Sequence, residues 1–358
     1  MVTLGVLVTN LLQEEDYFTA MAKAAFLEDV NLFLFLPSDL DPSEKKVKGK
    51  FFCHESNSWQ ENLFELPMFV YDRCFYENEE VFKNHFPLVS WLKSQPDIYF
   101  LGHGLPNKWV VHTILKDDQL IKPFLPDTEL VTKPNIVFSM LAREKSVLLK
   151  PVSGSQGKGI FVLTRKDNGY ELFAKKSGEP FHKQISKRQV EHLINKVSSK
   201  RRYLVQPFLQ LTNQDQRPFD LRIFLQKNKE GKWTVVGRGI RTGKIGDYTS
   251  NLGSGGEVSS FDEWLHHLPM DAWQPFQQTL LTLVERIPNI LEKNGQQLFE
   301  VGLDFGFALD GKLWLLEVNS KPGRKVITTC FPDKKNSLAK APIDYCLYLD
   351  KQRKGVGI

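Results

Sequence analysis

The clearest alternation of apolar and polar positions lies toward the C-terminal end of the chain. Apolar residues occupy every second position there: Phe299, Val301, Leu303, Phe305 and Phe307. This period of two predicts a strand with one buried face. A second apolar run, Leu313–Leu316, predicts a buried partner strand. Asp310-Gly311 lies between the runs and is typical of a two-residue hairpin turn, because glycine adopts positive φ freely and aspartate tolerates it.

The polar residues of this hairpin form a candidate metal site. A two-residue turn places Asp304 opposite Glu317, and Gly302 opposite Asn319. Opposed carboxylates destabilise a hairpin unless something neutralises them. Mg²⁺ fits best, since it takes one or two protein carboxylates and completes its octahedron with water and phosphate oxygens; Mn²⁺ is the alternative ion. An edge hairpin with solvated acids is the other interpretation.

Residues 1–104 alternate short apolar strands with helix-like stretches. The predicted strands are Leu4–Val8, Leu32–Leu36 and Met68–Tyr71, and Tyr17–Asp29 has helical spacing. The alternation favours a small α/β domain with a mostly parallel sheet. Asp72-Arg73 follows one of these strands. We interpret this pair as a surface ion pair, with a pair that faces a cleft as the alternative.

A lone lysine and a glycine-rich loop mark the middle of the chain. Three prolines between residues 123 and 134 predict an extended connector after a helix-like run. Ser146–Val152 is an apolar strand with one charge, Lys150, which has to reach the edge of the sheet or meet an anion. The loop 153–159 and the strand 160–163 follow it.

The loop 153–159 reads Ser-Gly-Ser-Gln-Gly-Lys-Gly. Its glycines allow backbone N–H groups to approach phosphates closely. The loop does not match a P-loop, which needs Lys-Ser or Lys-Thr after its last glycine and then a helix, because Gly159 is followed by Ile160 and a strand. The dinucleotide fingerprint Gly-x-Gly-x-x-Gly is absent too. A plain hairpin with a flexible turn is the alternative.

The stretch from residue 203 to the C-terminus adds further strands and one long helix. Within the strand 217–226, Asp220 and Arg222 share one face, and aliphatic residues share the other. The planar guanidinium of Arg222 suits a phosphate or a carboxylate. Residues 272–294 predict a helix that Pro288 kinks or divides. We expect the chain after residue 325 to be partly helical at most.

Composition sets outer limits on the function. The chain has 358 residues with 41% hydrophobic and 25% charged residues, as is ordinary for a globular protein. Its four cysteines lack metal-ligand spacing, and no apolar run is long enough for a membrane span. The net charge of +5 is mild, and we interpret short basic clusters such as Lys45–Lys50 as solvated. We expect a cytoplasmic protein that binds neither membrane nor nucleic acid.

The hairpin and the loop together resemble a known family. Asp304, followed by Glu-x-Asn at 317–319 and by Ser-Lys-Pro-Gly at 320–323, is similar to the Mg²⁺-binding hairpin of the ATP-grasp superfamily. The elements Asn-Lys-Trp at 107–109 and Phe-Asp-Leu-Arg at 219–222 resemble the YheC/YheD family of spore-coat-associated ATP-grasp proteins. The likeness extends from about residue 107 to residue 323, and more weakly over the N-terminal part.

The resemblance implies an α/β (α+β) ATP-grasp fold. An N-terminal α/β pre-ATP-grasp domain would span residues 1–105, a linker helix and ATP-covering lobe 106–209, and a C-terminal lobe with the metal hairpin 210–350. The two lobes would clamp ATP. ATP and Mg²⁺ are the implied cofactors.

The resemblance also implies roles for individual residues. The nucleotide would bind to Lys108, Lys150, Gly154, Ser155, Gln156, Gly157, Gly159, Gln206, Pro207, Phe208 and Leu316. Within that set, residues 206–208 would form the hinge beside the adenine. The metal ligands would be Asp304, Glu317 and Asn319, and the catalytic residues Arg222, Arg241 and Asn251. Arg238 and Arg241 would lie in a substrate-side loop.

The function implied is an ATP- and Mg²⁺-dependent ligase. It would join a carboxylate to an amine or a thiol through an acylphosphate, and its acceptor would be a small molecule or a peptide. Two alternatives stay open at this point. One is a nucleotide-binding structural or regulatory protein of the spore without turnover, with spore-coat proteins as partners. The other is an ATP-grasp kinase that phosphorylates a hydroxyl group.

Overall fold

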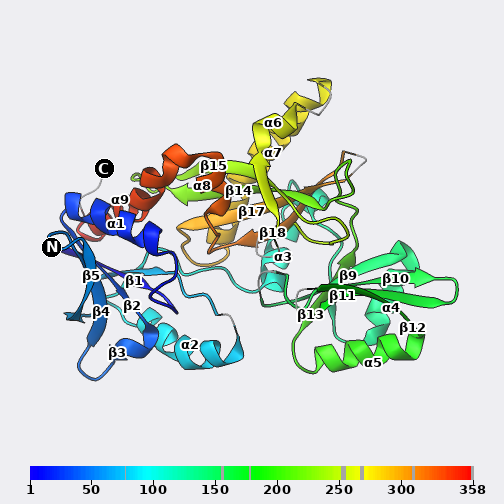
Figure 1. Ribbon diagram of the computed structural model, residues 1–358, viewed down its shortest axis with the longest axis horizontal. Helices are drawn as coiled ribbons and strands as arrows, with labels where there is room; N and C mark the ends of the chain where they lie inside the picture. Colours follow the sequence, from blue (N-terminus) through cyan, green and yellow to red (C-terminus); the bar gives the residue numbers. More distant parts are fainter. Residues whose placement is uncertain are drawn as a thin grey trace.

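The computed structural model describes residues 1–76, 78–154, 157–176, 179–250, 255–266, 270–308 and 311–355. Three sheets organise these residues (Figure 1). A seven-stranded N-terminal sheet and a six-stranded sheet lie at opposite ends of the long axis, and a five-stranded sheet lies between them. No helix in the described ranges has the length and apolar character needed to cross a membrane.

The N-terminal sheet has the order β3-β4-β2-β1-β6-β7, with β5 paired to β4. Its strands are β1 (Val2–Leu7), β2 (Val30–Phe35), β3 (Leu40–Asp41), β4 (Lys46–Cys53), β5 (Ser58–Glu65), β6 (Phe69–Asp72) and β7 (Tyr99–Phe100). Strands β1, β2, β6 and β7 pair in parallel as expected. The helices α1 (Glu15–Leu27) and α2 (Glu79–Lys93) connect them.

The prediction of a mostly parallel sheet was wrong, because β3, β4 and β5 pair antiparallel and make the sheet mixed. The basic cluster at residues 45–50 also lies largely on strand β4 rather than in a solvated loop. Lys48 there pairs with Glu61 of β5 at 2.7 Å. Opposite charges across neighbouring strands stabilise such a hairpin, which explains how the lysines fit a strand.

The six-stranded sheet has the order β12-β11-β10-β9-β13-β8 and is antiparallel where its pairs are described. It consists of β8 (Glu129–Val131), β9 (Ser146–Pro151), β10 (Phe161–Lys166), β11 (Gly169–Lys176), β12 (Glu179–Ile185) and β13 (Tyr203–Pro207). The helices α4 (Pro134–Glu144) and α5 (Lys187–Ser198) contribute to its core. The prediction of an extended connector as far as residue 134 was wrong at its C-terminal end, because Pro134 begins α4. Proline is tolerated at the first position of a helix, where its missing N–H would have no partner within the helix.

The five-stranded sheet has the order β16-β15-β14-β17-β18 and is antiparallel. Its strands are β14 (Phe219–Lys227), β15 (Trp233–Thr242), β16 (Glu257–Ser260), β17 (Glu300–Phe307) and β18 (Leu313–Asn319). The helices α3 (Lys108–Lys116), α6 (Phe261–Leu265) and α7 (Met270–Lys293) cover one face. Pro288 does not divide α7, so that part of the prediction was wrong, while a kink at Pro288 stays a prediction; apolar residues on both sides of it, Val284, Ile287 and Leu291, are buried in the core.

The C-terminal segment contains two helices, α8 (Lys325–Cys330) and α9 (Lys335–Arg353). The prediction that this segment is partly helical at most therefore underestimated its helix content. Helix α9 packs against α1 (Figure 1) and joins the core of the N-terminal sheet through Ile343, Tyr345 and Cys346. The apolar residues of α9 do not lie along one stripe of the helix. Pro342 and several other positions are buried as well. Residues near the C-terminal end of the chain therefore complete the hydrophobic core of the N-terminal sheet.

The hairpin β17–β18 brings Asp304 opposite Glu317, and Gly302 opposite Asn319, as predicted. Its turn is not the predicted two-residue turn, because Ala308 and Lys312 face each other across three residues. The register also shifts between Asp304 and Phe305, with Leu316 as the extra residue of β18. The longer turn and the bulge each shift the register by one residue in opposite directions. The polar residues therefore still face one another.

A buried ion network ties the N-terminal sheet to the hairpin. Arg73 follows β6 and is fully buried; its guanidinium contacts Glu14 at 2.9 Å and Glu300 at 2.6 Å. Arg324, which follows β18, binds the same two carboxylates and stacks over a tyrosine ring. The interpretation of Asp72-Arg73 as a surface ion pair was therefore wrong. Sequence pattern cannot reveal this burial, because the partners are distant along the chain.

We expect Arg73→Met to lower the free energy of unfolding by about 3–5 kcal/mol, because it leaves Glu14 and Glu300 with Arg324 alone among the described cations and so leaves one negative charge of the network without a cation. Urea titration followed by tryptophan fluorescence measures the change. Arg143→Met is the matched control, since Arg143 forms exposed ion pairs with Asp127 and Glu129, worth at most about 1 kcal/mol. Equal effects of the two substitutions would contradict the role of the network.

Candidate nucleotide and metal site

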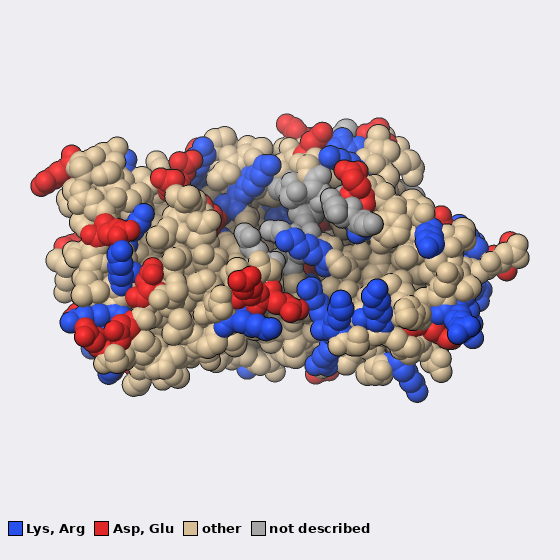
Figure 2. Space-filling model, turned by 60° about the horizontal axis from the view of Figure 1, so that its bottom comes forward, with Lys and Arg blue, Asp and Glu red and all other residues tan. Residues whose placement is uncertain are grey.

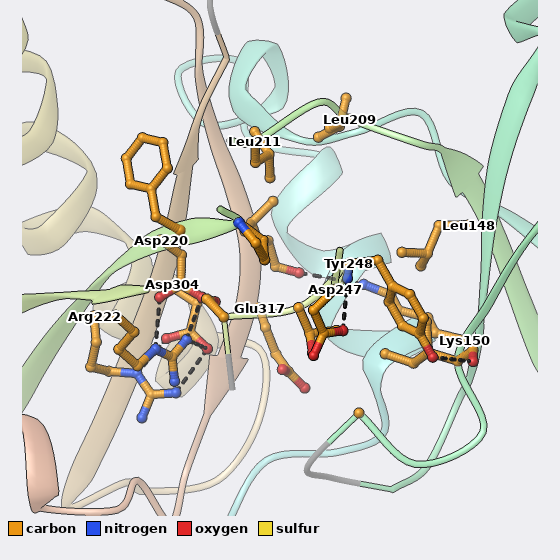
Figure 3. Close-up of a pocket in the computed structure, with 18 of the residues that line it drawn as sticks. Leu148, Lys150, Leu209, Leu211, Asp220, Arg222, Asp247, Tyr248, Asp304 and Glu317 are labelled. Atoms are coloured by element: carbon orange, nitrogen blue, oxygen red, sulfur yellow. Dashed lines mark hydrogen bonds and ion pairs between the residues drawn. The ribbon is translucent and has the colours of Figure 1, made fainter. Parts of the chain in front are cut away.

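A cavity of about 1050 Å³ lies between the five-stranded and the six-stranded sheet (Figure 3), and loops of the N-terminal sheet reach its lining. Its walls come from β9 and β13 of the six-stranded sheet, β14, β15, β17 and β18 of the five-stranded sheet, and the segments that follow β1 and β6. Pockets that bind small ligands have volumes of about 300–1,000 Å³, so this cavity lies at the upper end of that range. Five of its charged residues lie on the five-stranded sheet: Asp220, Arg222, Arg241, Asp304 and Glu317.

The first charged group centres on Asp304 of β17, which is 4% exposed. Arg222 of β14 lies opposite it and binds both carboxylate oxygens, and Arg241 of β15 reaches Oδ2 at 3.0 Å (Figure 3). Burial opposes ionisation of Asp304, but the two arginines outweigh it and hold its pKa below the usual range. Asp304 is therefore a carboxylate at neutral pH.

Asp220 extends this group along β14. Arg241 donates to both of its oxygens, at 2.7 and 2.6 Å, and Ser250 also donates to it. Arg241 consequently bridges Asp220 and Asp304. The expectation that it lies in a loop was wrong, because it belongs to β15. Arg238 points elsewhere: it pairs with Asp262 at 2.8 Å and stacks over Phe261.

The second charged group surrounds Glu317 of β18. Lys108, the first residue of α3, pairs with Glu317 at 3.1 Å and also donates to the carbonyl of Gly154 in the glycine loop. Asn319 donates from Nδ2 to Asp304 at 3.3 Å, which leaves its carbonyl oxygen for another partner. Protein cations therefore neutralise the opposed carboxylates. Gly302 makes room for Pro322 and Arg222, since a Cβ there would lie 2.8 Å from Pro322.

The donors on this hairpin suit Mg²⁺. Among the described residues, no three His, Cys, Asp or Glu side chains gather as metal ligands, so the site offers two carboxylates and an amide. This set matches an ion that keeps several positions for water and phosphate. Arg222, Arg241 and Asn319 all contact Oδ2 of Asp304. Within the part of the chain that the structure describes, Oδ1 accepts only from Arg222, so Oδ1 keeps a lone-pair direction for an ion. Glu317 has a side chain that is 32% exposed and can reach a ligand in the cavity.

Lys150 of β9 faces this hairpin from the six-stranded sheet. Its ammonium donates to the carbonyl of Leu316 at 3.4 Å. Burial lowers the pKa of Lys150 to about 8; Glu317 raises the pKa and Lys108 lowers it further. The bulged residue Leu316 thus presents its carbonyl oxygen to Lys150. Among the described residues, no carboxylate lies within ion-pair distance of this lysine. Such a lysine is a candidate binder of anions.

The glycine loop joins the two predicted strands, β9 and β10, which pair antiparallel. Gly154, Gly157 and Gly159 all have positive φ, of +132°, +70° and +79°. Gly159 is also held closely, because its carbonyl accepts from Tyr203 at 3.1 Å and a Cβ would lie 3.0 Å from Pro151. Ser155 and Gln156 lie outside the described residues.

The apolar part of the cavity lies beside β13. Its lining includes Pro126, Leu148, Pro207, Phe208, Leu209 and Leu211. Within the predicted hinge, the side chain of Gln206 donates to Thr128 at 2.6 Å, and the backbone N–H of Phe208 donates to Ser146 at 3.0 Å. Both donors are therefore already used within the protein. An aromatic ring system fits such an apolar slot with a polar rim.

The segment after β15 reaches across the cavity to the six-stranded sheet. Asp247 pairs with Lys175 of β11, and Tyr248 donates to the carbonyl of Ile160 at 2.9 Å. The Tyr248 ring also contacts Phe173 edge to face, with centroids 4.8 Å apart. This segment joins the two sheets on one side of the cavity (Figure 3). Asn251 follows it but lies outside the described residues.

Most of the predicted site residues lie in one place. The cavity lining contains Lys150, Gly157, Gln206, Pro207, Phe208, Arg222, Arg241, Asp304, Leu316, Glu317 and Asn319. Lys108, Gly154 and Gly159 do not line it, although Lys108 binds Glu317 directly. Sequence reasoning left Glu14, Arg73 and Lys325 out of the site. The strand-end position of Asp72-Arg73 was a signal for Arg73, because a pair that faces a cleft was the alternative interpretation there; the lining by Glu14 and Lys325 depends on tertiary structure.

The fold and the sequence relate this chain to known proteins. The profile of the family described as YheC/D like ATP-grasp matches residues 97–349. The chain belongs to this family. It is 33% identical to the endospore coat-associated protein YheC of Bacillus subtilis (strain 168), over 99% of each chain. The family assignment based on the hairpin and loop motifs is confirmed.

Solved structures agree on the ATP-grasp fold. D-alanyl-alanine synthetase A of Vibrio cholerae O1 is similar with a TM-score of 0.56 and 13% identity, over 98% of this chain and 96% of that one. A RiPP-associated ATP-grasp ligase of Chryseobacterium gregarium, in complex with ADP and a leader and core peptide, is similar with a TM-score of 0.53 and 12% identity. The similarity covers 98% of this chain and 97% of that one. At these identities the likeness shows the fold alone.

The surroundings of Lys150 can be tested through its pKa. NMR titration of its ¹³Cε resonance should give a value of about 8. Glu317→Gln should lower that pKa, because it removes a favourable negative charge, whereas Lys108→Ala should raise it by removing a like charge. A titration at the ordinary value of about 10.4, or shifts of the same sign in both variants, would contradict the described geometry.

Proposed function

We propose that this YheC/D-like ATP-grasp protein is an ATP- and Mg²⁺-dependent ligase that joins a carboxylate to an amine or a thiol. One observation carries the proposal. Two buried arginines, two lysines and the three oxygen donors of one hairpin gather at one end of a cavity, and an apolar slot lies beside them. Phosphoryl transfer needs such positioned charge, together with a place for a base.

The nucleotide would lie across the two sheets. Its adenine would enter the apolar slot beside residues 206–208 and Leu316. Lys108, Lys150 and the loop 153–159 would hold the phosphates, since lysine ammonium groups and glycine-rich backbone N–H groups both bind phosphate oxygens. Phosphates would also attract Lys108 away from Glu317, with which it now pairs.

Asp304, Glu317 and Asn319 would hold Mg²⁺. The ion would neutralise charge on the β- and γ-phosphates and order them for in-line transfer. Arginine pairing keeps Asp304 ionised at neutral pH, which a metal ligand requires. In Arg222 and Arg241, the bonds to aspartate use Nε and Nη2. The Nη1 groups then remain for the reacting substrate.

The reaction would run in two steps. A carboxylate oxygen of the acceptor attacks the γ-phosphorus, and the bond to the β-phosphate oxygen breaks, giving an acylphosphate and ADP. An amine or thiol then attacks the acyl carbon, loses its proton and expels phosphate. Arg222, Arg241 and Asn251 would stabilise the negative charge that develops in these steps. Catalysis would rest on position and charge rather than on a nucleophilic side chain of the protein.

The relatives support the substrate range of this proposal. The solved neighbours include a ligase in complex with ADP and a peptide, and a D-alanyl-alanine synthetase. We therefore propose an acceptor that is an amino acid or a peptide. Because YheC is named an endospore coat-associated protein, we also propose that this chain acts at the spore coat.

Release of ADP from Mg·ATP in the presence of pooled amino acids, peptides and other carboxylic acids tests the proposal. The protein should release ADP only when both a carboxylate and a nucleophile are supplied, and a condensed product should appear by mass spectrometry. A phosphorylated hydroxyl product would identify a kinase. ATP binding without ADP release for any pool would favour a structural or regulatory nucleotide binder.

Glu317→Gln should abolish Mg²⁺-dependent turnover and preserve the fold. The substitution keeps the shape of the side chain but removes a charged oxygen donor. ADP release measures the first effect, and circular dichroism the second. Glu191→Gln on α5 is the control, because that residue lies on a helix outside the cavity lining. Near-normal turnover in Glu317→Gln would remove the metal assignment.

The affinity for Mg·ATP should fall with rising pH as Lys150 loses its proton. Since its pKa is about 8, the charged form predominates below pH 8 and disappears above it. Binding at pH 9 should then be about tenfold weaker than at pH 7, because each pH unit above the pKa reduces the protonated fraction tenfold. Lys150→Arg should bind with little pH dependence, since guanidinium stays charged. Calorimetry at both pH values measures this; a steep fall in Lys150→Arg would contradict it.

A further inference from the structure

We propose that the end of the cavity beside the N-terminal sheet binds a negatively charged group of the acceptor, with Lys325 as its main contact. The acceptor would then carry a second negative charge besides the carboxylate that reacts, as a dicarboxylic amino acid or an acidic peptide does. This inference rests on the proposed function and names the substrate class of the same site.

The position of this end follows from the N-terminal sheet. Strands β1 and β6 are parallel neighbours, and the segments that follow them contribute Gln13, Glu14, Arg73 and Phe75 to the cavity lining. Ligands of such sheets bind outside the carboxyl ends of the strands. The segment after β18 supplies the opposite wall, including Lys321 and Lys325. Two different sheets therefore enclose this end.

The walls are held in place before any ligand binds. Glu14 adopts a positive φ of 48°, which is uncommon for a residue with a side chain, and Arg73 and Arg324 both bind its carboxylate. Arg324 is itself 6% exposed and also contacts Tyr71. Lys325 directly follows this anchored arginine. Its backbone is consequently fixed at the rim of the cavity.

The charges at this end do not balance. The carboxylate of Glu14 is taken up by two arginines, and Asp72 is paired with both Lys321 and Lys93. Lys325 is exposed and lines the cavity, yet its ammonium forms no ion pair with any residue that the structure describes. A free ammonium facing a preorganised pocket favours an anionic group of a ligand.

The surface beside the cavity adds to this preference. Basic residues outnumber acidic ones in the stretch 145–202, which forms most of the lobe built on the six-stranded sheet. Figure 2 shows lysine and arginine side chains gathered along the lower edge of the right-hand half of the molecule, where that lobe lies. Such a surface speeds the approach of anionic ligands. The specific contact would still come from Lys325.

Calorimetric binding of tripeptides tests the inference without requiring turnover. The probes are Glu-Glu-Glu, Ala-Ala-Ala and Lys-Lys-Lys, each added to protein saturated with Mg²⁺ and a non-hydrolysable ATP analogue. Glu-Glu-Glu should bind at least tenfold more tightly than the other two. Lys325→Glu should weaken its binding at least tenfold and leave the affinity for the ATP analogue unchanged.

Two matched charge reversals distinguish a local contact from the general field. Lys200→Glu changes the basic lobe and Lys335→Glu changes α9; neither residue lines the cavity. Both variants should bind Glu-Glu-Glu within twofold of the unaltered protein. Equal binding of all three peptides, no binding of Glu-Glu-Glu, or equal losses in Lys325→Glu and Lys200→Glu would overturn the inference. Peptide binding with no ADP release from any pool would preserve this site and reject the ligase.

Discussion

The opposition of Asp304 and Glu317 across β17 and β18 is the constraint on which the site depends. Two carboxylates side by side in a hairpin repel each other, and the fold answers with cations from three other elements. Arg222 and Arg241 come from neighbouring strands of the same sheet, and Lys108 comes from the start of α3. The hairpin can therefore form without a metal.

These cations also join the parts of the molecule. Lys108 binds both the hairpin and the glycine loop, so α3 links the five-stranded sheet to the six-stranded one. On the other side, Arg73 and Arg324 share the half-buried carboxylate of Glu14 and the buried one of Glu300, and link the hairpin to the N-terminal sheet. The polar end of the cavity thus lies between two sets of ion pairs. A ligand that carries phosphates and a carboxylate would exchange partners with the first set and leave the second intact.

Local patterns predicted the strands of this site well, because alternation and charge spacing act within a few residues. The strand with Lys150, the shared face of Asp220 and Arg222, and the opposition of Asp304 and Glu317 all follow from a period of two. The facing pair survived an incorrect turn only because the bulge at Leu316 offset it. A turn alone therefore does not determine the register of a hairpin, because a bulge in one strand can shift it back by one residue.

Features set by distant parts of the chain could not be predicted in this way. Arg73 is buried between partners that are distant along the chain, since Glu14 precedes α1 and Glu300 lies on β17, and α9 forms its core contacts with α1 at the other end of the chain. Pro288 remains within α7 because apolar residues on both sides of it pack into the core. The domain boundaries and the roles assigned to single site residues remain predictions.

A crystal structure of the protein with Mg²⁺ and a non-hydrolysable ATP analogue tests the central claim most directly. The account predicts the ion at about 2.0–2.1 Å from carboxylate oxygens of Asp304 and Glu317, with Lys108 moved from Glu317 to the phosphates. The base should lie in the slot beside residues 206–208. A nucleotide bound elsewhere, or one bound here while Lys108 keeps its contact with Glu317 and no ion is present, would contradict it.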